Sequence, residues 1–169
     1  MVMGCGRIFK VATKFDFGDG NGPVPAHQHR NLDGSLGGWG ADSAHVAETV
    51  FVDKYATVCG KSTVLGHVEM WDNARVMDNA TVLNHVKIFD DAVVCDSAYV
   101  VGNAVLQNKA VVGQRTTVQD HAVIRGTAKV FFDEDEPVGK YANLSCGTWY
   151  GKGGDIVMWL QQLDDDIGI

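Results

Sequence analysis

The sequence predicts an all-β fold in which very short parallel strands coil into a three-sided prism. The first observation is a period of six residues, which runs from Ala44 to Asp133 without an insertion or deletion. The second is that one position of the period is small or β-branched, while the position two residues later is aliphatic throughout. The third is that turn-forming residues follow the aliphatic position. A fixed short period of this kind indicates a solenoid.

Two columns of the repeat identify the interior. Their positions are two residues apart, so both side chains point to the same side of a short strand. We therefore expect both columns to line the axis of the prism. The small column is Ala44, Val50, Ala56, Ser62, Val68, Ala74, Ala80, Val86, Ala92, Ala98, Ala104, Ala110, Thr116, Ala122 and Ala128. The aliphatic column is Val46, Val52, Val58, Val64, Met70, Val76, Val82, Ile88, Val94, Val100, Leu106, Val112, Val118, Ile124 and Val130.

The remaining positions identify the outside and the corners. The residue between the two columns varies freely, as His45, Phe51 and Glu69 show, and is expected to face outward. Pairs such as Asp72-Asn73 and Asp78-Asn79 follow the strands, and these residue types tolerate left-handed backbone angles. Three strands and three corners close a triangle. One rung therefore takes eighteen residues, and about five rungs fit in the repeat.

The repeat resembles that of the hexapeptide-repeat left-handed parallel β-helix proteins. Their unit is an aliphatic residue, three variable residues, a small residue and one more, as in Val76-Met77-Asp78-Asn79-Ala80-Thr81. The resemblance covers about half of the chain and implies a left-handed parallel β-helix over residues 44–133. Because such relatives are typically trimers packed along their faces, it also implies a homo-oligomer, with a trimer favoured. One departure is that large apolar residues often follow the aliphatic position, where the family often has small or acidic ones.

The two ends of the chain interrupt the repeat. Residues 1–43 are expected to form an N-terminal cap, with a strand over 7–17 and glycine-rich turns. Residues 15–27, with Gly37-Gly38-Trp39, also resemble leaders of uncharacterised hexapeptide-repeat proteins of bacteriophages and prophages. Residues 134–169 are expected to form a C-terminal cap, in which 141–150 continues or caps the solenoid and 154–163 is a short helix. Two interpretations of Trp159 stay open: it covers the end of the solenoid, or it docks on a neighbouring subunit or partner.

Outward residues eighteen apart should stack, which sorts them onto three faces. The first face is apolar and carries no charge apart from any protonated His45. Contiguous apolar area on a soluble protein usually marks an interface, so we expect this face to be buried between subunits. The alternative is that the N-terminal strand folds back over it. The candidate interface residues, taken from all faces and the C-terminal helix, are Leu65, Trp71, Met77, Leu83, Phe89, Tyr99, Val101 and Trp159.

Histidines form a column at one predicted corner. His67 and His85 are eighteen residues apart, and so are Asn103 and His121. Adjacent imidazoles at rung spacing can share a metal ion or flank an anion. The γ-class carbonic anhydrases share this fold and hold zinc with three histidines from two subunits, but at a chain separation that this column does not reproduce. The sequence therefore predicts no metal site, and His67, His85 and His121 stay candidates beside the interpretation of a polar, solvated corner.

A second histidine pair lies in the N-terminal segment. His27 and His29 are separated by one residue and are expected to face one side of an extended strand. No cysteine or carboxylate at a characteristic spacing completes a ligand set, although Asp16 and Asp19 lie nearby. This pair is therefore the weaker of the two histidine candidates.

Composition excludes several classes of function. A net charge of −7 disfavours direct binding to a nucleic-acid backbone, and no apolar run approaches the ~20 residues that cross a bilayer. Four cysteines without paired spacing indicate reduced thiols and a cytoplasmic location, in the host cell if a phage encodes the chain. We expect a non-enzymatic binding protein without a cofactor. It would present a rigid oligomeric β-helix to a host macromolecule, such as a component of a host defence system that it inhibits, or trap a ligand between subunits.

The alternative function is an acyltransferase, because many hexapeptide-repeat proteins transfer acyl groups from acetyl-CoA. In that case a histidine at a subunit interface would act as the general base, and His45, His67, His85 and His121 are the candidates. The repeat lacks the interrupting loop that builds the acceptor pocket in many of those enzymes. Binding therefore remains the first expectation, and fold alone does not decide between the two.

Overall fold

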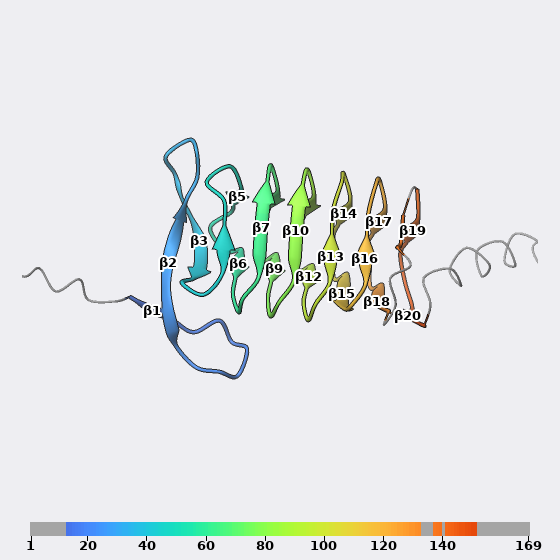
Figure 1. Cartoon of the computed structure of the whole chain (residues 1–169), viewed down its shortest axis with the longest axis horizontal. Helices are drawn as coiled ribbons and strands as arrows, with labels where there is room; N and C mark the ends of the chain where they lie inside the picture. Colours follow the sequence, from blue (N-terminus) through green and yellow to red (C-terminus); the bar gives the residue numbers. More distant parts are fainter. Residues whose placement is uncertain (1–12, 133–136, 140, 152–169) are drawn as a thin grey trace, which may run out of the picture.

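The computed structural model describes residues 13–132, 137–139 and 141–151, which form a parallel β-solenoid. Figure 1 shows the rungs stacked along the longest axis, with β2 and β3 at one end and β19 and β20 at the other. Three parallel sheets make the sides of the prism, and we name them walls 1, 2 and 3. Wall 1 consists of β4 (His45–Val46), β7 (Thr63–Gly66), β10 (Thr81–Asn84), β13 (Tyr99–Val100) and β16 (Thr117–Val118).

Wall 2 and wall 3 complete the prism. Wall 2 consists of β5 (Phe51–Val52), β8 (Glu69–Met70), β11 (Lys87–Ile88), β14 (Val105–Leu106), β17 (Val123–Ile124) and β19 (Asn143–Leu144). Wall 3 consists of β3 (Leu36–Ala41), β6 (Thr57–Val58), β9 (Arg75–Val76), β12 (Val93–Val94), β15 (Val111–Gln114), β18 (Lys129–Phe132) and β20 (Thr148–Gly151). At its edge, wall 3 is joined by the antiparallel strands β2 (Val24–Arg30) and β1 (Lys14–Phe15).

The register of the walls is constant. Thr63 pairs with Thr81, Lys87 with Val105 and Val93 with Val111, an offset of eighteen residues each time. The same offset holds for the parallel pairs from β3 to β18. The predicted rung of eighteen residues is therefore confirmed, and no loop interrupts residues 45–132.

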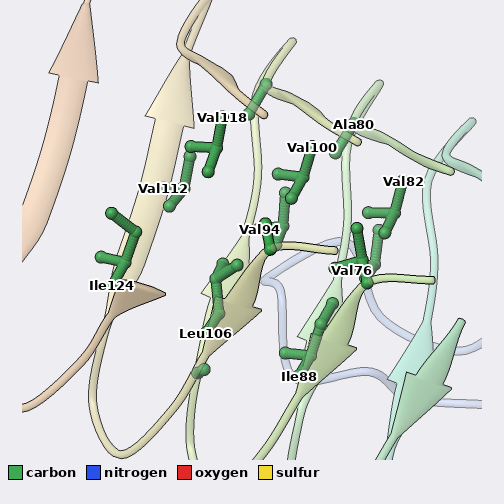
Figure 2. Packing of buried hydrophobic residues seen from close by; sticks show 14 of the residues in the cluster. Val76, Ala80, Val82, Ile88, Val94, Val100, Leu106, Val112, Val118 and Ile124 are labelled. Carbon is green, nitrogen blue, oxygen red and sulfur yellow. The ribbon is translucent and has the colours of Figure 1, made fainter. Parts of the chain in front are cut away.

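The two predicted columns form the core. Figure 2 shows Val76, Val82 and Val94, among others, pointing into the interior between the walls. From Val50 to Val130 the small and aliphatic columns are buried. Ala44 and Val46, in the first rung, are only half-buried. Each aliphatic side chain removed from water stabilises the fold by roughly 1.5–3 kcal/mol, so the axis is the main source of stability.

The corners adopt the left-handed backbone that the turn residues predict. Every sixth position from Gly60 to Gly126 has a positive φ. The non-glycine members are Asp72, Asp78, Asn84, Asp90, Asp96, Asn108, Gln114 and Asp120. Their side chains also link rungs, because the amide of Asp96 donates to the carboxylate of Asp78 at 3.1 Å, and the amide of Gln114 donates to that of Asp96 at 2.7 Å. Asx side chains thus accept hydrogen bonds from backbone amides at the turns.

The N-terminal hairpin of β2 and β3 covers the first rung. The side chain of Asn31 makes the hydrogen bonds that a strand of a preceding rung would make to Val52. Its Oδ1 accepts from the amide of Val52 at 2.9 Å, and its Nδ2 donates to the Val52 carbonyl at 3.2 Å. Nε2 of the buried His29 donates to the carbonyl of Val50 at 2.9 Å. Burial lowers the pKa of His29, and the bond to Val50 only partly opposes this shift. These contacts pair backbone groups that an open solenoid end would leave exposed.

The solenoid extends beyond the repeat at both ends. About five rungs were expected, and wall 2 has six strands, so there are about six turns. The expectation that 141–150 continues the solenoid is confirmed, since Asn143 pairs with Val123 and Thr148 with Lys129. These offsets are twenty and nineteen residues. Because neither equals eighteen, a strict period of six residues does not detect the last turn. The predicted helix at 154–163, including Trp159, lies outside the described residues.

The core assignment predicts the effect of a charge in the axis. Val82 is fully buried, so Val82→Asp places an unpaired carboxylate in an apolar interior, at a cost of several kcal/mol. We expect loss of the cooperative thermal transition followed by circular dichroism. Val105→Asp is the matched control, because Val105 is half-buried and faces outward on wall 2, and it should keep the fold. A Val82→Asp protein with an unchanged melting temperature would contradict the core assignment.

The close approach of the hairpin predicts a second effect. A Cβ atom on Gly38 would overlap the carbonyl oxygen of Ala56, whereas one on Gly40 would lie 3.9 Å from the nearest atom, the carbonyl oxygen of His27. Gly38→Ala should therefore displace the hairpin and lower the melting temperature by several degrees, while Gly40→Ala should change it little. Equal melting temperatures for the two variants would show that the hairpin does not pack closely on the first rung.

Candidate interaction surfaces

Wall 1 carries no Asp, Glu, Lys or Arg at its outward strand positions, unlike wall 2 and wall 3. Its outward strand positions carry Thr63, Thr81, Tyr99 and Thr117, and the positions after the aliphatic column carry Leu65, Leu83 and Val101. The latter three are half-buried in the monomer, and Tyr99 is 39% exposed. No Asp, Glu, Lys or Arg occupies the outward positions of β4, β7, β10, β13 and β16. The side chains predicted for the first face therefore do lie together.

The described part of the N-terminal extension lies against wall 3 and not against wall 1. Phe17 forms a cluster with Cys59, and Met77 packs against it. The guanidinium of Arg75, on β9, donates to the carbonyl of Phe17. The alternative in which the N-terminal strand covers the first face is therefore not what residues 13–43 do. Met77, a candidate interface residue, contacts the chain's own extension.

Aromatic residues gather where wall 2 meets the next corner. The rings of Phe51 and Trp71 are 4.4 Å apart between centroids, and Trp71 is 37% exposed. The indole N–H of Trp71 donates to Glu69 at 3.1 Å, and Glu69 pairs with Lys87 at 3.1 Å. Burial raises the pKa of Glu69, but the hydrogen bonds from Trp71 and Lys87 outweigh it, so the pKa is lowered. Phe89, half-buried, stands one rung beyond Trp71.

The predicted histidine column exists, and it is divided. The rings of His67 and His85 stack with centroids 5.4 Å apart and planes inclined by 25°. Asn103 separates them from His121, whose ring stacks on Tyr141 at 5.9 Å. All three histidines are exposed, and His45 stands apart on wall 1. The structure thus places His67 and His85 side by side and His121 two rungs away from His85.

His27 and His29 do not act together as two ligands. Nδ1 of His27 lies 2.8 Å from the carboxylate of Asp42 at the surface, whereas His29 is buried and bonded to Val50. A register shift between Gln28 and Arg30 interrupts the alternation of β2. The weaker histidine candidate is therefore not a pair of ligands on one side of the strand, and the bulge is the physical reason.

A cluster that sequence reasoning missed lies beside wall 3. Ligand atoms of Asp78, Cys95 and Asp96 all lie within 4.8 Å of one another. Burial and then the charges of Asp96 and Asp78 raise the pKa of Cys95 to about 12, which disfavours the thiolate, the nucleophilic form. Both carboxylates accept backbone amides of the next rung. Eighteen-residue spacing of acidic turn residues is the signal that identifies this cluster, and its visible role is structural.

Comparisons with known proteins return no family model, no curated protein and no solved structure that matches this chain. The fold and the surfaces therefore stand on the sequence pattern and on the structure. Among the described residues, no helix is long and apolar enough to span a membrane. Trp159 lies outside the described residues, so its two interpretations stay predictions.

The hydrogen bonds between corner residues of successive rungs predict different effects for two substitutions of Asp96. Asp96→Ala removes the acceptor of the Gln114 amide. It also places alanine, which has no polar side-chain atom, at a position with left-handed backbone angles. We expect the free energy of unfolding to fall by about 1–2 kcal/mol. Asp96→Asn should retain most of the stability, because Asn108 performs the same role by accepting from the amide of Gly126 at 3.2 Å. Equal losses in urea unfolding would contradict this role.

Proposed function

We propose that this chain works by binding, without catalytic turnover, and that copies associate through wall 1. The observation that carries the proposal is a wall that has an apolar column and no Asp, Glu, Lys or Arg at its outward strand positions, on a chain whose net charge is −7. Leu65, Leu83 and Val101 form a continuous apolar column across successive rungs, and the described N-terminal residues leave it open. Such a patch on a soluble protein usually belongs to an interface.

Charge supports a second copy as the occupant of wall 1. Copies with the same negative net charge repel one another, and the repulsion is least where two uncharged surfaces meet. Outward positions of wall 2 carry Glu69 and Lys87, and those of wall 3 carry Arg75 and Lys129. Wall 1 is thus the surface on which a like-charged copy buries apolar area without burying a charge.

We favour a trimer over a dimer, because the hexapeptide-repeat proteins that the sequence resembles are typically trimers packed along such faces. Five strands spaced by about 4.8 Å give wall 1 a height of roughly 24 Å. In such a trimer the wall 1 surfaces of three copies would face one another.

We also propose that the aromatic corner of wall 2 contacts a different macromolecule. Trp71 is partly exposed beside Phe51 and close to the Glu69–Lys87 ion pair, which is the mixture of aromatic anchor and polar rim common in protein recognition. The finer proposal is a hexapeptide-repeat, left-handed β-helix protein of phage or prophage origin that acts on a host macromolecule in the host cytoplasm. It is supported by the six-residue period and by the resemblance of residues 15–27, with Gly37-Gly38-Trp39, to leaders of phage and prophage proteins.

The oligomer proposal predicts a molar mass and a variant that changes it. Light scattering at micromolar concentration should give a multiple of 18.2 kDa, three copies for the trimer. Leu83→Arg should yield the monomer, because it places a charge in the centre of wall 1. Val105→Arg is the matched control, since Val105 is also half-buried and outward-facing but belongs to wall 2.

Two results would contradict the proposal. A wild-type mass of 18.2 kDa would contradict the oligomer. Acylation of an acceptor that requires acetyl-CoA and one of the exposed histidines would show catalysis in place of binding.

For the aromatic corner, Trp71→Ala should abolish binding of the partner macromolecule while the molar mass of the oligomer stays that of the wild type.

A further inference from the structure

We propose that His67 and His85 form a binding site for a borderline divalent cation such as Zn²⁺, Ni²⁺ or Cu²⁺. Their imidazole rings stack at 5.4 Å with planes only 25° apart, and both side chains are exposed to solvent at the corner between wall 1 and wall 2. This site does not depend on the proposed function, because each chain carries both ligands.

The backbone holds the two histidines at a fixed separation. The preceding strands, β7 and β10, are four residues long, and their pairing extends to Gly66 and Asn84, directly before the histidines. The amide of His67 then donates to the carbonyl of Asn84 at 2.7 Å, and that of His85 to Gly102 at 2.9 Å. Only side-chain torsions have to adjust when a cation binds, which keeps the entropy cost low.

The chemistry of the pair selects the cation. Neutral imidazole nitrogens suit Zn²⁺, Ni²⁺ and Cu²⁺, whereas Mg²⁺ and Ca²⁺ prefer oxygen ligands. Bonds of about 2.0–2.1 Å to one ion require the two nitrogens to lie roughly 3 Å apart. Stacked rings on neighbouring rungs reach this separation when their facing edges turn toward each other. Water fills the remaining coordination positions.

The electrostatic surroundings permit a cation. The left-handed corner residues before the histidines are Gly66 and Asn84, which carry no charge. The nearest lysine in the sequence, Lys87, directs its ammonium group to Glu69 at 3.1 Å.

The column contains its own control. His121 occupies the same corner three rungs after His67, but its neighbours are Asn103 and Tyr141. If one exposed histidine were enough, His121 would bind as well as the pair does. Asn103 also shows that asparagine fits this corner, so His→Asn variants should fold.

The test is isothermal titration of ZnCl₂ and NiCl₂ into the full, untagged chain at about pH 7.5, where a free imidazole is neutral. We expect one equivalent per chain with micromolar affinity. His67→Asn and His85→Asn should each weaken this binding by at least about tenfold, while His121→Asn should leave it unchanged. Circular dichroism verifies the fold of each variant.

Two further measurements separate a shared site from independent ligands. The Cu²⁺ electron paramagnetic resonance spectrum should show two coordinated nitrogens in the wild type and one in His67→Asn. Asn103→His should tighten binding, because it adds a third stacked imidazole beside His85. Equal weakening by His121→Asn and His67→Asn, a one-nitrogen spectrum for the wild type, or no tightening in Asn103→His would each overturn the proposal.

Discussion

The backbone hydrogen bonds between each rung and the rung eighteen residues later are the interaction on which this structure depends. Most strands are only two residues long, so no strand is stable alone, and each acquires its partners from the rungs on either side. The buried columns enforce this register, because a shift by one residue would turn Val82 or Ile88 outward and expose the axis. Corner carboxylates such as Asp96 add side-chain hydrogen bonds to this linkage at the turns, beside backbone bonds such as that from the Ser97 amide to the Gln114 carbonyl.

A constant register also decides what the surface can do. It converts a spacing in the sequence into a vertical column, so residues that share a chemical character at eighteen-residue intervals become a continuous stripe. Leu65, Leu83 and Val101 become an apolar stripe on wall 1 in this way, and His67 and His85 become a stacked pair. The uninterrupted rungs build their surfaces from such stripes and not from inserted loops. For this reason both proposals for the molecule concern binding to a rigid surface.

Much of this architecture can be predicted from the sequence because the period is visible. Both core columns, the three faces, the corner backbone and the adjacency of His67 and His85 all follow from positions modulo eighteen. The remainder depends on contacts that have no period. The bulge in β2 separates His27 from His29, and the N-terminal extension packs against Met77. The strands of the last turn pair with the preceding turn at offsets of twenty and nineteen residues. Thr116 is a similar case: it interrupts the alanine column because its hydroxyl accepts the amide of the buried Phe132 at 2.8 Å, next to the point where the period changes.

Amide hydrogen exchange measured by NMR tests the stacked register most directly, because it reports each inter-rung hydrogen bond separately. If rungs stabilise one another over residues 45–132, the amides of Thr81, Lys87 and Val93, one on each wall, should exchange slowly and at similar rates, set by cooperative unfolding. The amides of the 18–22 turn, whose hydrogen bonds are local ones to Asp16 and Asp19, should exchange quickly. Exchange of the wall 1 amides at the rate of an unstructured peptide, with protection confined to the other walls, would contradict the closed three-sided solenoid.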